Sequence, residues 1–293
     1  MKPPSLDTVE QAIGAELLRA RYAYSEREAI LYALGVGAPA HWLAPHELKF
    51  VHELQPDFQV LPTFAVIFAK DLHELVLSGN IAGIKFNPMQ LVHGEQELRL
   101  AKPLPRAAAV DSTVRVADIH DKGSGLLLTL EVESRDEAGG LLAQARSSMF
   151  IRGLGGFGGD RGATRELSPP ERPPDAVIEE ATLERQALIY RLSGDANPLH
   201  VDPQMAAIGN FDKPILHGLC TLGFSARAIL KGFCGNDAHR LAAISARFAH
   251  HVFPGETLVT EMWRNDAGEI RFQTKAKERD AVVLSQASAQ LRR

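Results

Sequence analysis

The chain is poor in cysteine and in net charge, and each shortage excludes a class of protein. Only two of its 293 residues are cysteine, Cys220 and Cys234, and they lack CxxC spacing, which excludes a disulfide scaffold and a cysteine zinc cluster. We expect two buried thiols in a reducing compartment. The formal net charge of -4 offers no overall attraction for nucleic acid or for an anionic membrane.

Long apolar runs and targeting segments are also missing. No apolar stretch reaches the roughly 18 residues that a membrane span needs, and no basic start leads into an apolar segment at the N-terminus. The last four residues, Gln290-Leu291-Arg292-Arg293, differ from the Ser-Lys-Leu signal of peroxisomal proteins. These absences predict a cytoplasmic protein without a membrane span. The composition that remains, 45% hydrophobic and 23% charged, is typical of a globular protein.

Glycine and proline gather in one stretch near the middle of the chain. Residues 153–175 read GLGGFGGDRGATRELSPPERPPD, which cannot hold a regular element. This pattern predicts an N-terminal unit (1–152), a linker (153–175) and a C-terminal unit (176–293). The two units are related, because ERxAxxYxL occurs at 26–34 and again at 184–192. We therefore expect two copies of one design, fused face to face.

The sequence pattern of each copy predicts an amphipathic helix followed by an antiparallel meander. Ser25 and Glu28 form a capping box for the first helix, while Thr182 is the expected N-cap of the second and Gly194 its end. Alternating residues predict strands at 113–119, 126–134, 141–151, 257–263, 269–277 and 282–291. A buried helix is predicted only in the second copy, at 219–233. We expect a vacancy on the first sheet, where apolar cargo could lie.

The loop after the second helix carries candidate chemistry. It reads DANPLH at 195–200, where Pro198 disfavours a helical Asn197, and Asp and Asn form side-chain turns. Asp195 and His200 can then face one point, and a carboxylate and an imidazole that meet there could divide a proton transfer. The alternative is a structural turn beside a hydrogen-bonded histidine.

Gly218 is predicted to open the buried helix. Unpaired backbone N–H groups and the helix dipole favour negative charge at such a position, so Gly218 is a candidate oxyanion donor. The alternative is that glycine only permits a tight turn there.

These motifs together resemble the MaoC-like hydratase 2 family, the (3R)-specific enoyl-CoA hydratases. The resemblance covers nearly the whole chain and implies an α+β double hotdog fold, in which the N-terminal copy has lost its central helix to admit a bulky acyl chain. The matching segments are LYALGVG at 31–37, HGEQ at 93–96, KPLP at 102–105, DKGSG at 121–125, GGFGG at 155–159, DANPLH at 195–200, LHGLC at 216–220 and FPGETL at 253–258.

The resemblance also implies roles for single residues. Asp195 and His200 would be the catalytic pair, and Asn197 would orient the loop or the catalytic water. Gly218 would contact the thioester, while the acyl-CoA site would be lined by His93, Gly94, Lys122 and Phe248. In the first copy Gly37 replaces Asp195 and Trp42 replaces His200, so we expect one active site per chain.

The implied activity is reversible syn hydration of trans-2-enoyl-CoA to (3R)-3-hydroxyacyl-CoA in fatty acyl-CoA metabolism such as β-oxidation. Two other functions stay open, a hotdog acyl-CoA thioesterase and a non-catalytic acyl-binding module. A homodimer is expected from the resemblance alone.

No cofactor is expected, because adding water moves no electrons and coenzyme A is part of the substrate. The glycines Gly153, Gly155 and Gly158 fit GxGxxG, but the prolines after them exclude the helix that a dinucleotide site needs. His46, His52 and His73 each precede glutamate, yet none has the second histidine of a zincin motif, so no metal is expected.

Overall fold

The computed structural model describes residues 2–41, 44–163 and 166–292, so Trp42 lies outside the described residues. The strands of the first half are β1 (Glu16–Tyr24), β2 (Asn80–Ile81), β3 (Ile84–Lys85), β4 (Leu91–Leu100), β5 (Ala108–Asp121), β6 (Gly125–Asp136) and β7 (Leu141–Arg152). Its helices are α1 (Leu6–Ala12), α2 (Glu26–Gly35) and α3 (Leu72–Leu77), with the 3₁₀ helices η1 (Pro45–Phe50), η2 (Pro62–Ile67) and η3 (Pro88–Gln90).

The second half begins after the linker. Its strands are β8 (Ala176–Ala181), β9 (Leu241–Phe248), β10 (Thr257–Arg264), β11 (Ile270–Ala276) and β12 (Ala281–Leu291). Its helices are α4 (Gln186–Tyr190), α5 (Pro203–Ile208) and α6 (Gly218–Phe233), with the 3₁₀ helices η4 (Arg191–Ser193), η5 (Pro198–His200), η6 (Ala238–Arg240) and η7 (Lys277–Arg279). All six predicted strands are confirmed, as β5 to β7 and β10 to β12.

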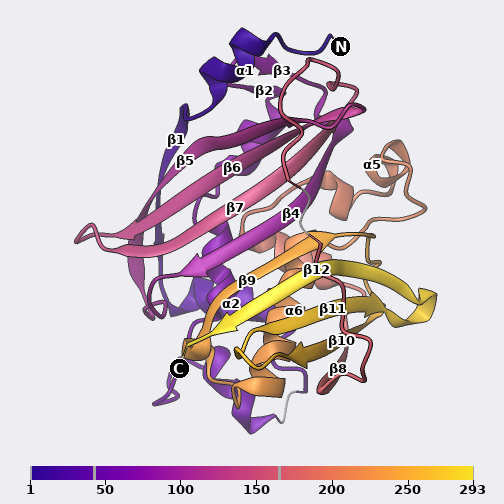
Figure 1. The fold of residues 1–293 in the computed structure, drawn as a ribbon. Helices are drawn as coiled ribbons and strands as arrows, with labels where there is room; N and C mark the ends of the chain where they lie inside the picture. The colour runs from indigo at the N-terminus through magenta and orange to yellow at the C-terminus, as the bar shows by residue number, and fades with distance from the viewer. Residues whose placement is uncertain (1, 42–43, 164–165, 293) are drawn as a thin grey trace.

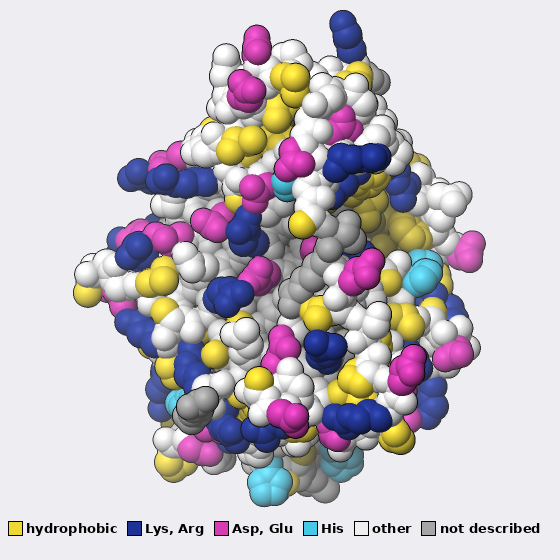
Figure 2. All heavy atoms as spheres, viewed as in Figure 1, with side chains coloured by type: hydrophobic (Ala, Val, Ile, Leu, Met, Phe, Trp, Pro, Cys, Tyr) yellow, Lys and Arg dark blue, Asp and Glu magenta, His cyan; other side chains and the backbone are white. Residues whose placement is uncertain are grey.

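One ten-stranded antiparallel sheet organises the molecule, in the order β1-β5-β6-β7-β4-β9-β12-β11-β10-β8. Figure 1 shows α2 and α6 behind this sheet, and Figure 2 shows its front face dotted with acidic and basic side chains. The halves meet where β4 pairs with β9, residues 95–99 lying against 243–247. The predicted face-to-face fusion is therefore wrong. The copies join edge to edge, because pairing across this seam satisfies the backbone groups of two open strand edges.

The helix α6 fills the concave face of the second half. Eleven of its residues, from Cys220 to Leu230, are buried, and it packs on β8, β9 and β10. Burying one large apolar side chain contributes about 1.5–3 kcal/mol, so this helix supplies much of the local stability. Cys220 and Cys234 are both buried free thiols, as expected. No helix in the described part of the chain is long and apolar enough to cross a membrane.

The described residues of the first half form no equivalent of α6. The longest helix there among the described residues is α2, which has 10 residues against the 16 of α6. The capping box of α2 is confirmed, because Glu28 accepts the Ser25 N–H at 2.9 Å. The predicted vacancy is wrong, however, at the part of the face formed by β4 and β7. There η2 packs against both strands and against α6, and Phe64 and Phe68 are fully buried.

The linker contains no helix or strand among its described residues, 153–163 and 166–175. Its glycines instead bind a carboxylate of the chain itself. The N–H groups of Gly156 and Gly158 donate to Asp121 at 2.9 and 2.8 Å, and Gly123 N–H adds a third bond of 2.8 Å. These bonds lower the pKa of Asp121. The glycine pattern therefore anchors the linker to the end of β5.

Thr182 does not cap the second helix, contrary to expectation. Its hydroxyl donates to the Glu256 carbonyl at 2.9 Å, and α4 begins only at Gln186. Gly194 ends the helical segment, as predicted, with a φ of 128° that favours glycine.

Candidate active site

The DANPLH loop is an ordered double turn. Asp195 Oδ1 accepts the Asn197 N–H at 3.1 Å, and Asn197 Oδ1 accepts the Leu199 N–H at 3.0 Å. Pro198 then starts η5, whose last residue is His200. The structural turn that sequence offered as an alternative is thus present, and it is also what brings the Asp195 carboxylate and the His200 imidazole to one place. Asn197 orients the loop through its side chain.

Two stacked histidines lie beside the carboxylate. The His200 and His217 rings are 3.7 Å apart between centroids, at 27°. His200 Nδ1 lies 2.8 Å from the Ile215 carbonyl, and His217 Nε2 lies 3.1 Å from the Asp195 carbonyl. A carbonyl oxygen can only accept, so each of these nitrogens carries the hydrogen. The neutral His200 ring therefore keeps an Nε2 lone pair free to accept a proton.

The charges of this group follow from burial and proximity. Burial raises the pKa of Asp195, but His217, His200 and His73 outweigh that effect and lower it. Burial lowers the pKa of His200, and burial together with His200 lowers that of His217 to about 3. At neutral pH the site consequently holds one carboxylate and two uncharged imidazoles.

The first half also reaches this site. His73 Nδ1 lies 3.5 Å from Asp195 Oδ1. His93 sits at the start of β4, where the register shifts at Gly94, and its ring lies 4.8 Å from the Phe248 ring. Burial lowers the pKa of His93 to about 4, while the charge of Asp195 works in the opposite direction. The site is therefore built from both halves.

Gly218 is the first residue of α6, as predicted, so its N–H has no acceptor within the helix. A Cβ at this position would lie 3.0 Å from the Phe248 ring, which shows how closely backbone and ring approach. The structure thus brings His93, Phe248 and Gly218 together beside the carboxylate. These are three of the five residues that the resemblance assigned to the substrate, the others being Gly94 and Lys122.

Lys122 stands apart from this group. It lies in the turn between β5 and β6, and its ammonium donates to the Arg161 carbonyl in the linker. Its assignment to the acyl-CoA site stays a prediction.

Sequence reasoning missed two members of the site. His217 stands in the LHGLC motif, in which Gly218 alone was predicted to act. His73 resembles only an incomplete zinc motif. The signal for His217 was local, but nothing in the sequence around His73 points to Asp195, since α3 and the DANPLH loop meet only in the folded chain.

Within the described ranges, one group of side chains could hold a metal ion, namely Asp195, His200 and His217. Their ligand atoms all lie within 4.8 Å of one another. The two imidazoles are stacked, whereas ligation needs in-plane nitrogen lone pairs aimed at one ion. The expectation that no metal is needed stays a prediction.

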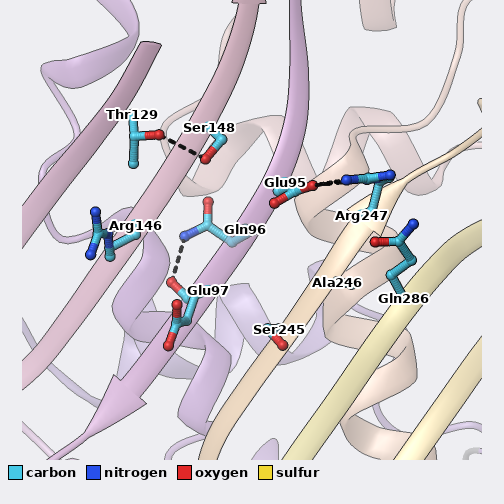
Figure 3. A pocket seen from close by; sticks show the side chains of 10 residues that line it. All are labelled: Glu95, Gln96, Glu97, Thr129, Arg146, Ser148, Ser245, Ala246, Arg247 and Gln286. Atoms are coloured by element: carbon cyan, nitrogen blue, oxygen red, sulfur yellow. Dashed lines mark hydrogen bonds and ion pairs between the residues drawn. The ribbon is translucent and has the colours of Figure 1, made fainter. Parts of the chain in front are cut away.

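A separate hollow of about 180 Å³ opens on the outer face of the seam (Figure 3). It is polar, with the Glu95–Arg247 ion pair at 2.5 Å and the Thr129–Ser148 hydrogen bond at 3.0 Å. The Asp195 group does not line it.

Comparisons with known proteins agree over both halves. Residues 22–153 match the model of the MFE-2 hydratase 2 N-terminal domain, and residues 165–287 match the MaoC like domain. Probable enoyl-CoA hydratase 2 of Dictyostelium discoideum is 43% identical and covers 94% of each chain. Peroxisomal multifunctional enzyme type 2 of Mus musculus is 46% identical over 96% of this chain, which spans only 38% of that protein's length.

Solved structures give the same result. A MaoC-like dehydratase from Phytophthora capsici superposes with a TM-score of 0.88 at 33% identity, covering 97% of this chain and 98% of the other. A Mycobacterium tuberculosis protein described as having a double hotdog fold matches at 14% identity and a TM-score of 0.60, over 99% of each chain, which supports the fold alone. The predicted double hotdog is confirmed, and the chain belongs to the MaoC-like hydratase 2 family of hydro-lyases.

Proposed function

We propose that the chain catalyses the reversible syn addition of water to trans-2-enoyl-CoA, forming (3R)-3-hydroxyacyl-CoA in fatty acyl-CoA metabolism. The observation that carries this proposal is the meeting of an ionised Asp195 with a neutral His200 whose Nε2 is free, beside the N-terminus of α6. Family membership supports the substrate class and the (3R) outcome.

In the proposed reaction Asp195 and His200 hold one water between them. His200 Nε2 takes a proton from this water while the oxygen forms its bond to C3, and the π electrons of the alkene move toward C2 and the thioester oxygen. The imidazolium then returns the proton to C2, so one water adds H and OH with no net change in the protein. Addition is syn because a single imidazole on one face handles the proton. The Asp195 carboxylate stabilises the transient imidazolium.

The Gly218 N–H would stabilise the negative charge on the thioester oxygen. The first N–H groups of a helix lack intrahelical acceptors and lie at the positive end of its dipole. Removing one such donor typically costs about 10²–10³ in rate.

The test is incubation of the purified chain with crotonyl-CoA. We expect the enoyl-thioester absorbance to fall without release of free thiol, and chiral analysis to give the (3R) product. Release of free thiol would identify a thioesterase instead, and no reaction of either kind would leave an acyl-binding module.

The acyl chain needs a place that the structure does not leave open over β4 and β7, because η2 lies there. We infer that long acyl groups are accepted only if η2 moves or if the acyl group follows another path through the protein. Turnover across trans-2-enoyl-CoAs of increasing length tests this. Unchanged turnover together with unchanged proteolytic protection of η2 would exclude movement.

We further propose a homodimer, which light scattering would test, and a cytoplasmic location. The mouse relative is named peroxisomal, so imaging of a tagged full-length chain separates the two compartments.

A further inference from the structure

His73 contacts the catalytic carboxylate from the opposite half of the molecule. Its Nδ1 lies 3.5 Å from Asp195 Oδ1, and the two side chains are 24% and 31% exposed. The His73 ring is an ion-pair partner of Asp195 when protonated and a neighbouring polar group when neutral. Neither the reaction scheme above nor the family motifs give this residue a role.

The segment that carries His73 is only partly buried, with Leu72 and Val76 packed against the edge of the core. None of the residues of α3 is fully buried. The residues just before the helix lie against the catalytic loop, because a Cβ on Gly194 would be 3.7 Å from Lys70 Cβ. Residues 70–73 thus border the catalytic loop at both Gly194 and Asp195, which makes the His73 contact part of a docked segment.

The contact selects one carboxylate oxygen. The Asn197 N–H donates to Asp195 Oδ1, and His73 faces the same oxygen. With Oδ1 engaged by both partners, Oδ2 is the oxygen left to hold the reacting water. A carboxylate fixed in this way cannot exchange its two oxygens by rotation without giving up both contacts.

We propose that His73 is a positioning residue of the hydration reaction, supplied by the first half, which fixes Asp195 Oδ1 so that Oδ2 holds the water beside His200. This proposal rests on the hydratase function proposed above. It assigns α3 a share in catalysis that the second half cannot provide for itself.

Several charged and titratable groups surround the carboxylate. His200 and His217 face it from the second half, and its charge works to raise the pKa of His93 on β4; burial raises the pKa of Tyr190 on α4, and the charge of Asp195 adds to that effect. Among them a protonated His73 lowers the pKa of Asp195 and also that of His200. Removing His73 should therefore raise both values and move the acid limb of the pH profile of kcat to higher pH.

The experiment compares His73→Leu, His73→Gln and a matched control in the intact chain, with crotonyl-CoA as the probe. The control is His239→Gln, because His239 Nδ1 also lies near an aspartate, 3.9 Å from Asp237 Oδ1, but at η6, beyond the opposite end of α6. We expect His73→Leu to lower kcat by roughly 3–10-fold, with little change in KM, and to raise the acid limb by about half a pH unit or more. His73→Gln, which keeps a donor, should recover part of kcat but not the pH shift.

A kcat and pH profile of His73→Leu equal to those of His239→Gln would overturn the proposal, and so would an effect confined to KM. Thermal unfolding of each variant separates these outcomes from misfolding. An inactive wild-type chain would reject the hydratase function itself, whereas an active wild type with an unaffected His73→Leu rejects only the role of His73.

Discussion

The two halves have the same design but cover the concave face of the sheet with different elements. In the second half α6 covers the concave sheet face and presents Gly218 to the site. In the first half η2 covers the face at β4 and β7, with Phe64 and Phe68. Gly37, at the repeat position of Asp195, adopts a φ of 81°, and a Cβ there would lie 2.3 Å from the Phe224 ring. In the first half, the position equivalent to Asp195 therefore serves close packing against α6.

Although it lacks the dyad, the first half is not a passive support. It supplies His73 and His93 to the remaining site, while its Gly37 packs under the helix that carries Gly218. The proposed dyad lies in one copy, and the residues around it come from both.

Removing the dyad should have the largest effect. Asp195→Asn or His200→Ala should lower turnover of crotonyl-CoA by about 10²–10⁴, because each removes a group that handles the proton or its charge. Steady-state kinetics on folded variants measure the loss. Turnover within a few-fold of wild type in either variant would contradict the assignment of the site to the second half.

The repeat position in the first half tests packing instead of chemistry. Gly37→Ala should destabilise the fold by about 1–2 kcal/mol through its left-handed backbone and by about 1–3 kcal/mol more through overlap with Phe224. Gly139→Ala is the matched control, since Gly139 has a φ of 80° and a Cβ there would meet no heavy atom within 4 Å. Urea unfolding measures both. Equal losses of unfolding free energy in the two variants would mean that the close approach of Gly37 to Phe224 adds nothing to stability.

The buried histidines predict a pH dependence of stability. The pKa of His217 is about 3 and that of His93 about 4 in the folded chain, below the ordinary value near 6.5. As pH falls below about 6.5 the unfolded chain takes up protons that the folded chain does not, so stability should fall by about 1.4 kcal/mol per pH unit for each such histidine.

Unfolding free energies at pH 7, 6 and 5 measure this slope. His217→Gln should flatten it by one histidine's share, whereas replacing the exposed His250 with glutamine should leave it unchanged. A wild-type slope in His217→Gln would show that His217 takes up its proton while folded.

The smallest expected effect concerns Lys122 in the first half. Lys122→Ala should raise KM for the CoA thioester by about 2–5-fold without changing kcat, because one partly exposed charge contributes little and is screened by salt. The matched control is Lys277→Ala in η7 of the second half. Equal KM values for the two variants at low salt would remove Lys122 from the substrate site.

Sequence predicted most of what depends on local patterns. The period-two alternation located β5 to β7 and β10 to β12, and the Ser25 capping box located the start of α2. The conformation of the loop at 195–200 could also be predicted, because DANPLH specifies its own turns through Asp195 and Asn197. In these segments the residues that determine the conformation lie within a few positions of it.

Features that depend on distant contacts were predicted poorly. The edge-to-edge seam depends on which strand edges are free once both sheets exist, and η2 fills a face that spacing alone described as empty. Thr182 has a good capping residue type, but the Glu256 carbonyl, which follows the FPG turn, binds its hydroxyl instead. His73 reaches Asp195 only through the docking of α3.

The β4–β9 seam has one more consequence. Each half taken alone would expose a long, unpaired strand edge, the feature through which sheets aggregate or exchange partners. The chain is in this sense a heterodimer whose subunits are tethered covalently, and the tether keeps the correct partner at high effective concentration while the shared edge forms. Synthesis as one polypeptide thus favours pairing of the copy that lacks the proposed dyad with the copy that carries it, over pairing of two identical copies.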